Sequence, residues 1–180
     1  RVDNPSIDQS RLPTVAVTPE GNPVVGFMKF EGNWIDPQYS VANSVDGGQS
    51  FQADVVASEE APGEVCDCCS AQVVASGDKQ AVVFRNNDDN LRDSWVSISS
   101  DGGSSFPIAE DVDDNNWLIN SCPASGPDGF FAGDSLYTTW MSEGTGNTRI
   151  FIASVSAIDG GIGHSGLVRN VPFDGTTENF

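Results

Sequence analysis

The sequence predicts an all-β protein made of repeated four-stranded sheets, arranged like the blades of a β-propeller. Two observations carry this prediction. Short β-branched and aromatic runs alternate with turns rich in Gly, Asp, Asn and Pro along the chain, as in strands joined by tight connections. In addition, a tight turn that leads into an apolar strand recurs at 18–27, 75–84 and 131–140. Four strands repeated at a steady period are typical of propeller blades.

Each repeat is expected to form one blade of four strands. The blades are predicted to cover approximately residues 11–60, 64–115 and 118–174 of the 180-residue chain. A propeller closes with about four to eight blades, because its inner strands must surround a channel without leaving open edges. Three blades therefore predict half of a six-bladed ring. We expect the rest of a longer chain, a second copy by self-association, or a partner chain to complete it.

A turn of the form Ser-x-Asp-Gly-Gly-x-x-Phe occurs twice in full, and a looser version follows at 156–165. The glycines permit backbone angles that other residues resist. The Asp carboxylate and the Ser hydroxyl can bond nearby amides, and the Phe can fold back onto the blade. A structural role rather than a catalytic one is expected for the two sets, which are Ser44, Asp46, Gly48 and Phe51, and Ser99, Asp101, Gly103 and Phe106.

These turns, "SVDGGQSF" and "SSDGGSSF", resemble the Asp box, also called the BNR repeat, of sialidase-like β-propellers. The resemblance covers nearly the whole chain as three blades. A second pattern, Cys-x-Cys-Cys followed one blade later by Cys-Pro, is similar to that of some exported bacterial proteins of the sialidase-like type. The resemblance implies the fold, whereas several unrelated activities share that fold.

The resemblance to sialidases also implies roles for two residues of the first blade. Arg11, in "RLP", matches the arginine that holds the substrate carboxylate, and Asp36, in "NWIDPQY", stands where a catalytic acid or base is usual. The chain departs from the family because the only basic residue between them is Lys29, which is no bidentate equivalent of arginine. The family's Tyr–Glu pair and its other arginines come from later blades. Arg11 as a surface residue and Asp36 as a turn residue before Pro37 remain open alternatives.

Four cysteines open the second and third blades, three of them in "CDCC". Inner strands of adjacent blades are neighbours, so all four are expected to converge at one rim of the channel. Disulfides are one interpretation, in which Cys122 staples the third blade to the second and the remaining two cysteines pair within "CDCC". A soft-metal site for copper or zinc is another, and free or redox-active thiols are a third. The residues concerned are Cys66, Cys68, Cys69 and Cys122.

Two polar stretches are candidate binding loops. The segment 84–93, "FRNNDDNLRD", contains Arg85 and Arg92 among acidic and amide side chains, and it predicts either a recognition loop, an oxygen-rich calcium site or a solvated hairpin loop. Trp34 and Trp117 also stand in polar surroundings. A tryptophan exposed at the mouth of a propeller can stack on a sugar or anchor a partner, although each could instead be tucked under its own loop.

The charge of the chain narrows the choice of ligand. A net charge of −18 and a pI near 4.1 exclude nucleic acid as a partner, because phosphate binding needs clustered Lys and Arg. No apolar run approaches the roughly 20 residues of a membrane span, and the cysteine pattern and composition favour a secreted or periplasmic bacterial protein. The sequence thus predicts a module that binds a glycan or a protein surface through loops at the channel mouth. The alternatives are a glycoside hydrolase completed by blades from elsewhere and a structural subunit that assembles through open blade edges.

Overall fold

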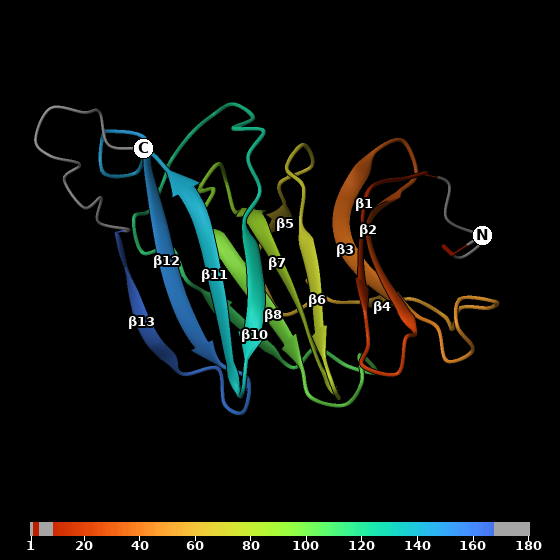
Figure 1. Cartoon of the computed structure of the whole chain (residues 1–180). Coiled ribbons are helices and arrows are strands. Elements are labelled where there is room, and N and C mark those ends of the chain that lie inside the picture. Colours follow the sequence, from red (N-terminus) through yellow and green to blue (C-terminus); the bar gives the residue numbers. More distant parts are fainter. Residues whose placement is uncertain (1, 4–8, 168–180) are drawn as a thin grey trace, which may run out of the picture.

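The structure, a computed structural model, describes residues 2–3 and 9–167, and that part of the chain contains strands and no helix. The strands form antiparallel four-stranded and five-stranded sheets standing side by side, which confirms the predicted all-β fold of blade-like sheets (Figure 1). Within these described ranges, no helix is long and apolar enough to cross a membrane. The predicted end of the third blade, 168–174, lies outside the described residues.

The first and third sheets are meanders, in which each strand pairs with the next one along the chain. Gly and Asn at the connections allow such tight reversals. The strands of the first sheet are β1 (Gln9–Val17), β2 (Pro23–Glu31), β3 (Ile35–Asn43) and β4 (Val55–Val56), and those of the third are β10 (Asp128–Ala132), β11 (Ser135–Ser142), β12 (Arg149–Ser156) and β13 (Ile162–Leu167).

The second sheet differs because two short strands, instead of one long strand, occupy the place of its first strand. The long strand β7 pairs along its first half with β6 and at its end with β5, so that the segment 66–71 interrupts the strand between the two pairings. Three of the four cysteines lie in this interruption. The strands of the second sheet are β5 (Glu64–Val65), β6 (Gln72–Ser76), β7 (Lys79–Asn87), β8 (Ser94–Ser99) and β9 (Ile108–Asp111).

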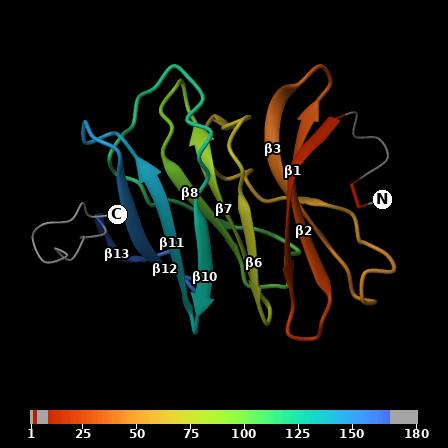
Figure 2. The same cartoon turned by 45° about the horizontal axis from the view of Figure 1, so that its top comes forward.

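The second sheet lies between the other two, and the strands β1, β6 and β10 are neighbours (Figure 2). Alternate residues of β7 face opposite cores: Val82 and Phe84 pack with the first sheet, whereas Ala81 and Val83 pack with the third. A strand covered on both faces needs apolar residues at successive positions. The continuous run "AVVF" is therefore explained by two layers of packing.

The two complete turns use the same hydrogen bonds. Oδ1 of Asp46 accepts hydrogen bonds from the Ser50 N–H (2.9 Å) and from Ser44 Oγ (2.9 Å), while Ser44 Oγ accepts one from the Gly48 N–H (2.8 Å). The second copy repeats this pattern around Asp101. Gly48 has φ of +87°, which side-chain-bearing residues rarely adopt. The structural role predicted for these turns rests on contacts within each turn.

Replacing Asp101 by alanine is expected to lower the free energy of unfolding by about 1 kcal/mol, the usual cost of losing a side chain that caps backbone amides. Hydrogen bonds from Ser105, then from Ser99, lower the pKa of Asp101 to about 2. The folded pKa is below the unfolded value of about 3.9, so the contribution of Asp101 is present above pH 4 and is lost as the pH falls toward 2.

Urea unfolding of the wild type and of Asp101→Ala between pH 2 and pH 7 measures this difference. The exposed aspartate Asp78 provides the control, because the same substitution there is expected to change stability by less than about 0.5 kcal/mol. A stability difference for Asp101→Ala that stays constant down to pH 2 would contradict the assignment.

Candidate functional site

A groove with a cavity volume of about 260 Å³ lies where the start of β3 approaches β5 of the second sheet. We call it the rim groove. Its lining comes from two sequence-distant segments together with the end of β7 and the loop that follows it. The lining residues are Trp34, Ile35, Asp36, Pro37, Glu64, Val65, Asp67, Asn87 and Arg92.

The β2–β3 connection holds the first wall of the groove in an unusual backbone conformation. Asn33, Trp34 and Asp36 have φ values of +56°, +64° and +51°. Asparagine tolerates this left-handed region, whereas a bulky residue such as tryptophan seldom adopts it, at a cost of about 1–3 kcal/mol. Such strain persists where surrounding contacts hold it and is concentrated at functional sites.

Trp34 is held at the edge of the groove with its ring accessible. Its side chain is 53% exposed, while its backbone N–H donates a hydrogen bond of 2.7 Å to Gln9 Oε1. The Phe30 ring supports it edge-on, with 5.0 Å between ring centroids. The indole therefore presents aromatic surface at a fixed place.

Carboxylates predominate among the charged groups of the rim groove. The groove is lined by the acidic residues Asp36, Glu64 and Asp67 and by one basic residue, Arg92. Arg92 is only 9% exposed, and its guanidinium donates to the Ile119 carbonyl (3.2 Å) and to a cysteine sulfur. A smaller hollow of about 100 Å³ adjoins the groove and shares Asp36 and Glu64 with it. The site is thus acidic, with its one arginine largely engaged by the protein.

Three of the residues that the sequence singled out, Trp34, Asp36 and Arg92, meet in the rim groove. Arg11, by contrast, is exposed on β1 and does not line it. Sequence reasoning missed Glu64 and Asp67. The only signal that could have found them is their position beside the cysteines, because Glu64 precedes "CDCC" and Asp67 lies within it.

Arg85 and Trp117 occupy the interior instead of the surface. The Arg85 guanidinium donates hydrogen bonds to the carbonyls of Ser125 (2.9 Å), Arg92 (2.5 Å) and Met141 (2.6 Å). Its Cζ lies 5.1 Å from the centre of the Trp117 ring, which is 6% exposed. Burial lowers the pKa of Arg85. These contacts join the second sheet to the third and leave almost no surface for a ligand.

The acidic residues of the 84–93 segment divide between surface and interior. Asp88 and Asp89 are exposed, whereas Asp93 is buried and accepts a hydrogen bond of 2.9 Å from the Trp117 N–H. Burial raises the pKa of Asp93 to about 6. The carboxylates of this segment are therefore spread over different surroundings, and the calcium site stays a prediction.

The cysteines converge, as predicted, and form one disulfide. Cys68 and Cys122 are bonded, with 6.2 Å between their Cα atoms, so the prediction of a staple between the second and third blades is confirmed. The second disulfide, predicted within "CDCC", does not form, because Cys66 and Cys69 are free and buried. The three sulfurs of Cys66, Cys68 and Cys69 lie within 4.8 Å of one another.

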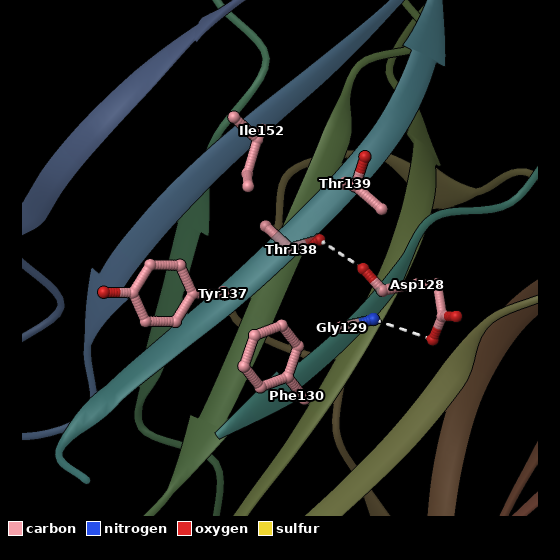
Figure 3. A pocket seen from close by; sticks show the side chains of 7 residues that line it. All are labelled: Asp128, Gly129, Phe130, Tyr137, Thr138, Thr139 and Ile152. Carbon is pink, nitrogen blue, oxygen red and sulfur yellow. Dashed lines mark hydrogen bonds between the residues drawn. The ribbon is translucent and has the colours of Figure 1, made fainter. Parts of the chain in front are cut away.

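A second hollow, of about 130 Å³, lies on the face of the third sheet that points away from the second (Figure 3). The rings of Phe130 and Tyr137 stack there across neighbouring strands, with centroids 5.5 Å apart. Phe130 is 60% exposed. Ile152 pairs with Thr139 and Ile150 pairs with Met141. Both partners lie on the same face of β11 as Tyr137, so the two isoleucines lie on that face as well. We call Phe130, Tyr137, Ile150 and Ile152 the outward apolar face.

No protein-family model matches the sequence, and no curated protein matches it. Solved structures do match in shape. The endosialidase of phage phi92 is similar with a TM-score of 0.58 and 14% identity, over 83% of this chain and 23% of the endosialidase. An α-L-arabinanase from Penicillium chrysogenum, complexed with arabinobiose, matches with a TM-score of 0.58 and 9% identity, over 96% of this chain and 53% of the arabinanase.

The GH93 α-L-arabinofuranosidase of Fusarium graminearum, also complexed with arabinobiose, matches with a TM-score of 0.58 and 9% identity, over 91% of this chain and 50% of the enzyme. At such identities the likeness concerns the fold alone. This chain spans between about a quarter and about half of the three proteins. Its fold is that of a glycosidase-like β-propeller.

Proposed function

We propose that this chain is a glycan-binding module and that the rim groove holds a neutral sugar. The observation that carries the proposal is that the exposed Trp34 ring lines the same groove as the carboxylates of Asp36, Glu64 and Asp67. An aromatic ring can cover the C–H face of a sugar, while carboxylates accept hydrogen bonds from its hydroxyl groups. A few polar groups around an apolar contact are the usual composition of a ligand site.

The charge of the groove favours a neutral glycan over an acidic one. Three carboxylates line it, and Arg92 already donates to protein acceptors. An anionic sugar would therefore meet repulsion that a neutral sugar avoids. The volume of about 260 Å³ falls below the range of about 300–1,000 Å³ typical of drug-sized ligands, so the groove suits a short stretch of a glycan.

Calorimetric titration with arabinobiose and with a sialic acid disaccharide tests the proposal. We expect arabinobiose to bind and Trp34→Ala to weaken its binding at least tenfold, because the stacking surface is lost. Trp34→Phe keeps a ring at this position and is the matched control, expected to retain most of the affinity. Equal affinity in the wild type and in Trp34→Ala, or a preference for the sialic acid disaccharide, would overturn it.

A glycoside hydrolase completed by further blades is the second candidate. In support, Asp36 and Glu64 both line the rim groove and the adjoining hollow, and glycosidases use a pair of carboxylates around the scissile bond. Catalysis predicts that Asp36→Asn abolishes release of arabinose from arabinan while arabinobiose still binds. Absence of any release by a wild-type propeller in which the further blades are present argues for binding alone.

We also propose that the outward apolar face packs against a second copy of this chain. Two observations support the proposal that a second copy of this chain covers the outward apolar face. The chain spans about half of two propeller enzymes, so two copies supply a full ring. The first sheet also has an apolar outer side, where Val15 and Val17 of β1 are 64% and 60% exposed. The third sheet of one copy can then cover the first sheet of the other.

We also propose that the chain is a secreted or periplasmic member of the sialidase-like Asp-box group. The matching hydrogen bonds around Asp46 and Asp101 support membership of the sialidase-like Asp-box group. The Cys68–Cys122 disulfide supports a secreted or periplasmic location, because disulfides persist in oxidising compartments.

A further inference from the structure

One free thiol lies directly against the disulfide that joins the second and third blades. The sulfur of Cys66 is 3.5 Å from the sulfur of Cys68, and Cys68 is bonded to Cys122. Cys66 is buried, Cys68 is half-buried and Cys122 is exposed. A nucleophile, an electrophile and a leaving group therefore occupy adjacent positions, with the leaving group at the surface.

Arg92 supplies a positive charge at the nucleophile. Its Nη1 lies 3.0 Å from the sulfur of Cys66. In the described part of the chain the ion pairs join Lys29 to Asp54 and Lys79 to Asp134, and Arg92 belongs to neither. A largely buried guanidinium is stabilised by a nearby anion, and a Cys66 thiolate would be such an anion.

The neighbouring thiol adds to this stabilisation. A hydrogen bond from Cys69, followed by the influence of the Cys68 N–H and of Arg92, lowers the pKa of Cys66 to about 6. The pKa of Cys69 is raised by the same contact and by burial. Cys66 is thus the thiolate of the pair near neutral pH, and Cys69 is the protonated donor.

We propose that Cys66, Cys68 and Cys122 form a thiol–disulfide exchange site. The Cys66 thiolate attacks the sulfur of Cys68, so that a Cys66–Cys68 bond forms and the Cys68–Cys122 bond breaks. The electron pair of the broken bond leaves on Cys122, which becomes a thiolate and takes a proton from water. The step consumes no oxidant or reductant, because one disulfide replaces another.

The released Cys122 is the group that meets an external substrate. Because Cys122 is exposed, its thiolate can attack a low-molecular-weight disulfide, forming a mixed disulfide with one half and releasing the other half as a thiolate. Cys69 can resolve the first product. Its N–H donates to the Cys66 carbonyl at 3.1 Å, which holds the two residues in one turn, and attack on Cys66 forms a Cys66–Cys69 bond while freeing Cys68.

The arrangement of aspartates places Cys66, the pair Cys68 and Cys69, and Cys122 on three different peptides. A protease that cleaves before aspartate separates the three relevant peptides, 54–66 with Cys66, 67–77 with Cys68 and Cys69, and 114–127 with Cys122. The native protein is incubated with iodoacetamide at pH 7.5, quenched with acid, digested without reduction and analysed by mass spectrometry.

The proposal predicts that carbamidomethylated Cys122 accumulates with time, while peptide 54–66 becomes linked to peptide 67–77. In Cys66→Ser, labelling of Cys122 is expected to fall at least tenfold, with 67–77 still linked to 114–127. Circular dichroism establishes whether this variant is folded. If it is not folded, the disulfide map of the wild type alone tests the proposed exchange.

Three wild-type outcomes would overturn the proposal. In the first, Cys122 remains linked to peptide 67–77 and carries no label. In the second, two disulfides join all three peptides. All four cysteines could also be alkylated, with no linkage between peptides. Labelling of Cys122 at the same rate in folded Cys66→Ser overturns it as well, because the release of Cys122 would then not depend on the Cys66 thiolate.

Discussion

Replacing Arg85 by methionine is expected to lower the free energy of unfolding by about 3–5 kcal/mol, because three backbone carbonyls lose their donor. The guanidinium is buried and donates to the carbonyls of Ser125, Arg92 and Met141. Methionine fills a similar volume but donates no hydrogen bond, so it leaves each carbonyl without its partner, at about 1–3 kcal/mol for a buried group. The loss is a large part of a typical total of about 5–15 kcal/mol.

Urea unfolding followed by tryptophan fluorescence measures this loss. Arg149→Met is the matched control, since Arg149 is exposed at the start of β12 and donates to the Thr148 carbonyl. Its substitution is expected to change stability by less than about 0.5 kcal/mol. If the two substitutions have similar effects, Arg85 does not join the second and third sheets as its contacts indicate.

Replacing Phe130 by aspartate is expected to convert a dimer of this chain into a monomer. Phe130 is 60% exposed and its ring stacks on Tyr137 within the outward apolar face. A carboxylate placed there would have to be buried without a partner when a second copy packs on it, at a cost of several kcal/mol. Each 1.4 kcal/mol weakens association tenfold.

Light scattering coupled to size-exclusion chromatography gives the mass of each species. The wild type is expected at twice the mass of the 19.0 kDa chain, and Phe130→Asp at the single mass. Ile158→Asp is the control, because Ile158 is also exposed, at 72%, but lies in the turn after β12. A monomeric wild type, or a Phe130→Asp variant that remains dimeric, would rule out the second copy as the occupant.

Much of the fold could be predicted from the sequence because its determinants are local. The turns around Asp46 and Asp101 form their hydrogen bonds within a few residues, so the same short sequence forms the same turn at both places. The division of the first strand position in the second sheet was not predicted. It arises because the segment 66–71 loops out between two pairings with β7, and this depends on tertiary contacts.

The candidate site was predicted less completely, for physical reasons that differ between residues. Trp34 and Asp36 belong to one hairpin, but their meeting with Glu64 depends on how two sheets pack. Arg85 and Trp117 were misleading because polar neighbours in sequence suggest a surface, whereas both side chains fill the space between two sheets. Cysteine spacing alone leaves connectivity open, so the free thiols of Cys66 and Cys69 emerged only from the structure.

The position of the second sheet between two others has a consequence for the lifetimes of its backbone amides. The outer sheets are each covered by this sheet on one side, whereas β7 has packed side chains on both of its faces. Amides exchange with solvent when a structural unit opens, and units with less buried apolar contact open more readily. An outer sheet can therefore open while the middle one stays intact, but the amides of β7 become accessible only after a neighbour has moved away. In a single copy of this chain, exchange would proceed from the two outer sheets inward, and β7 would retain its protons longest.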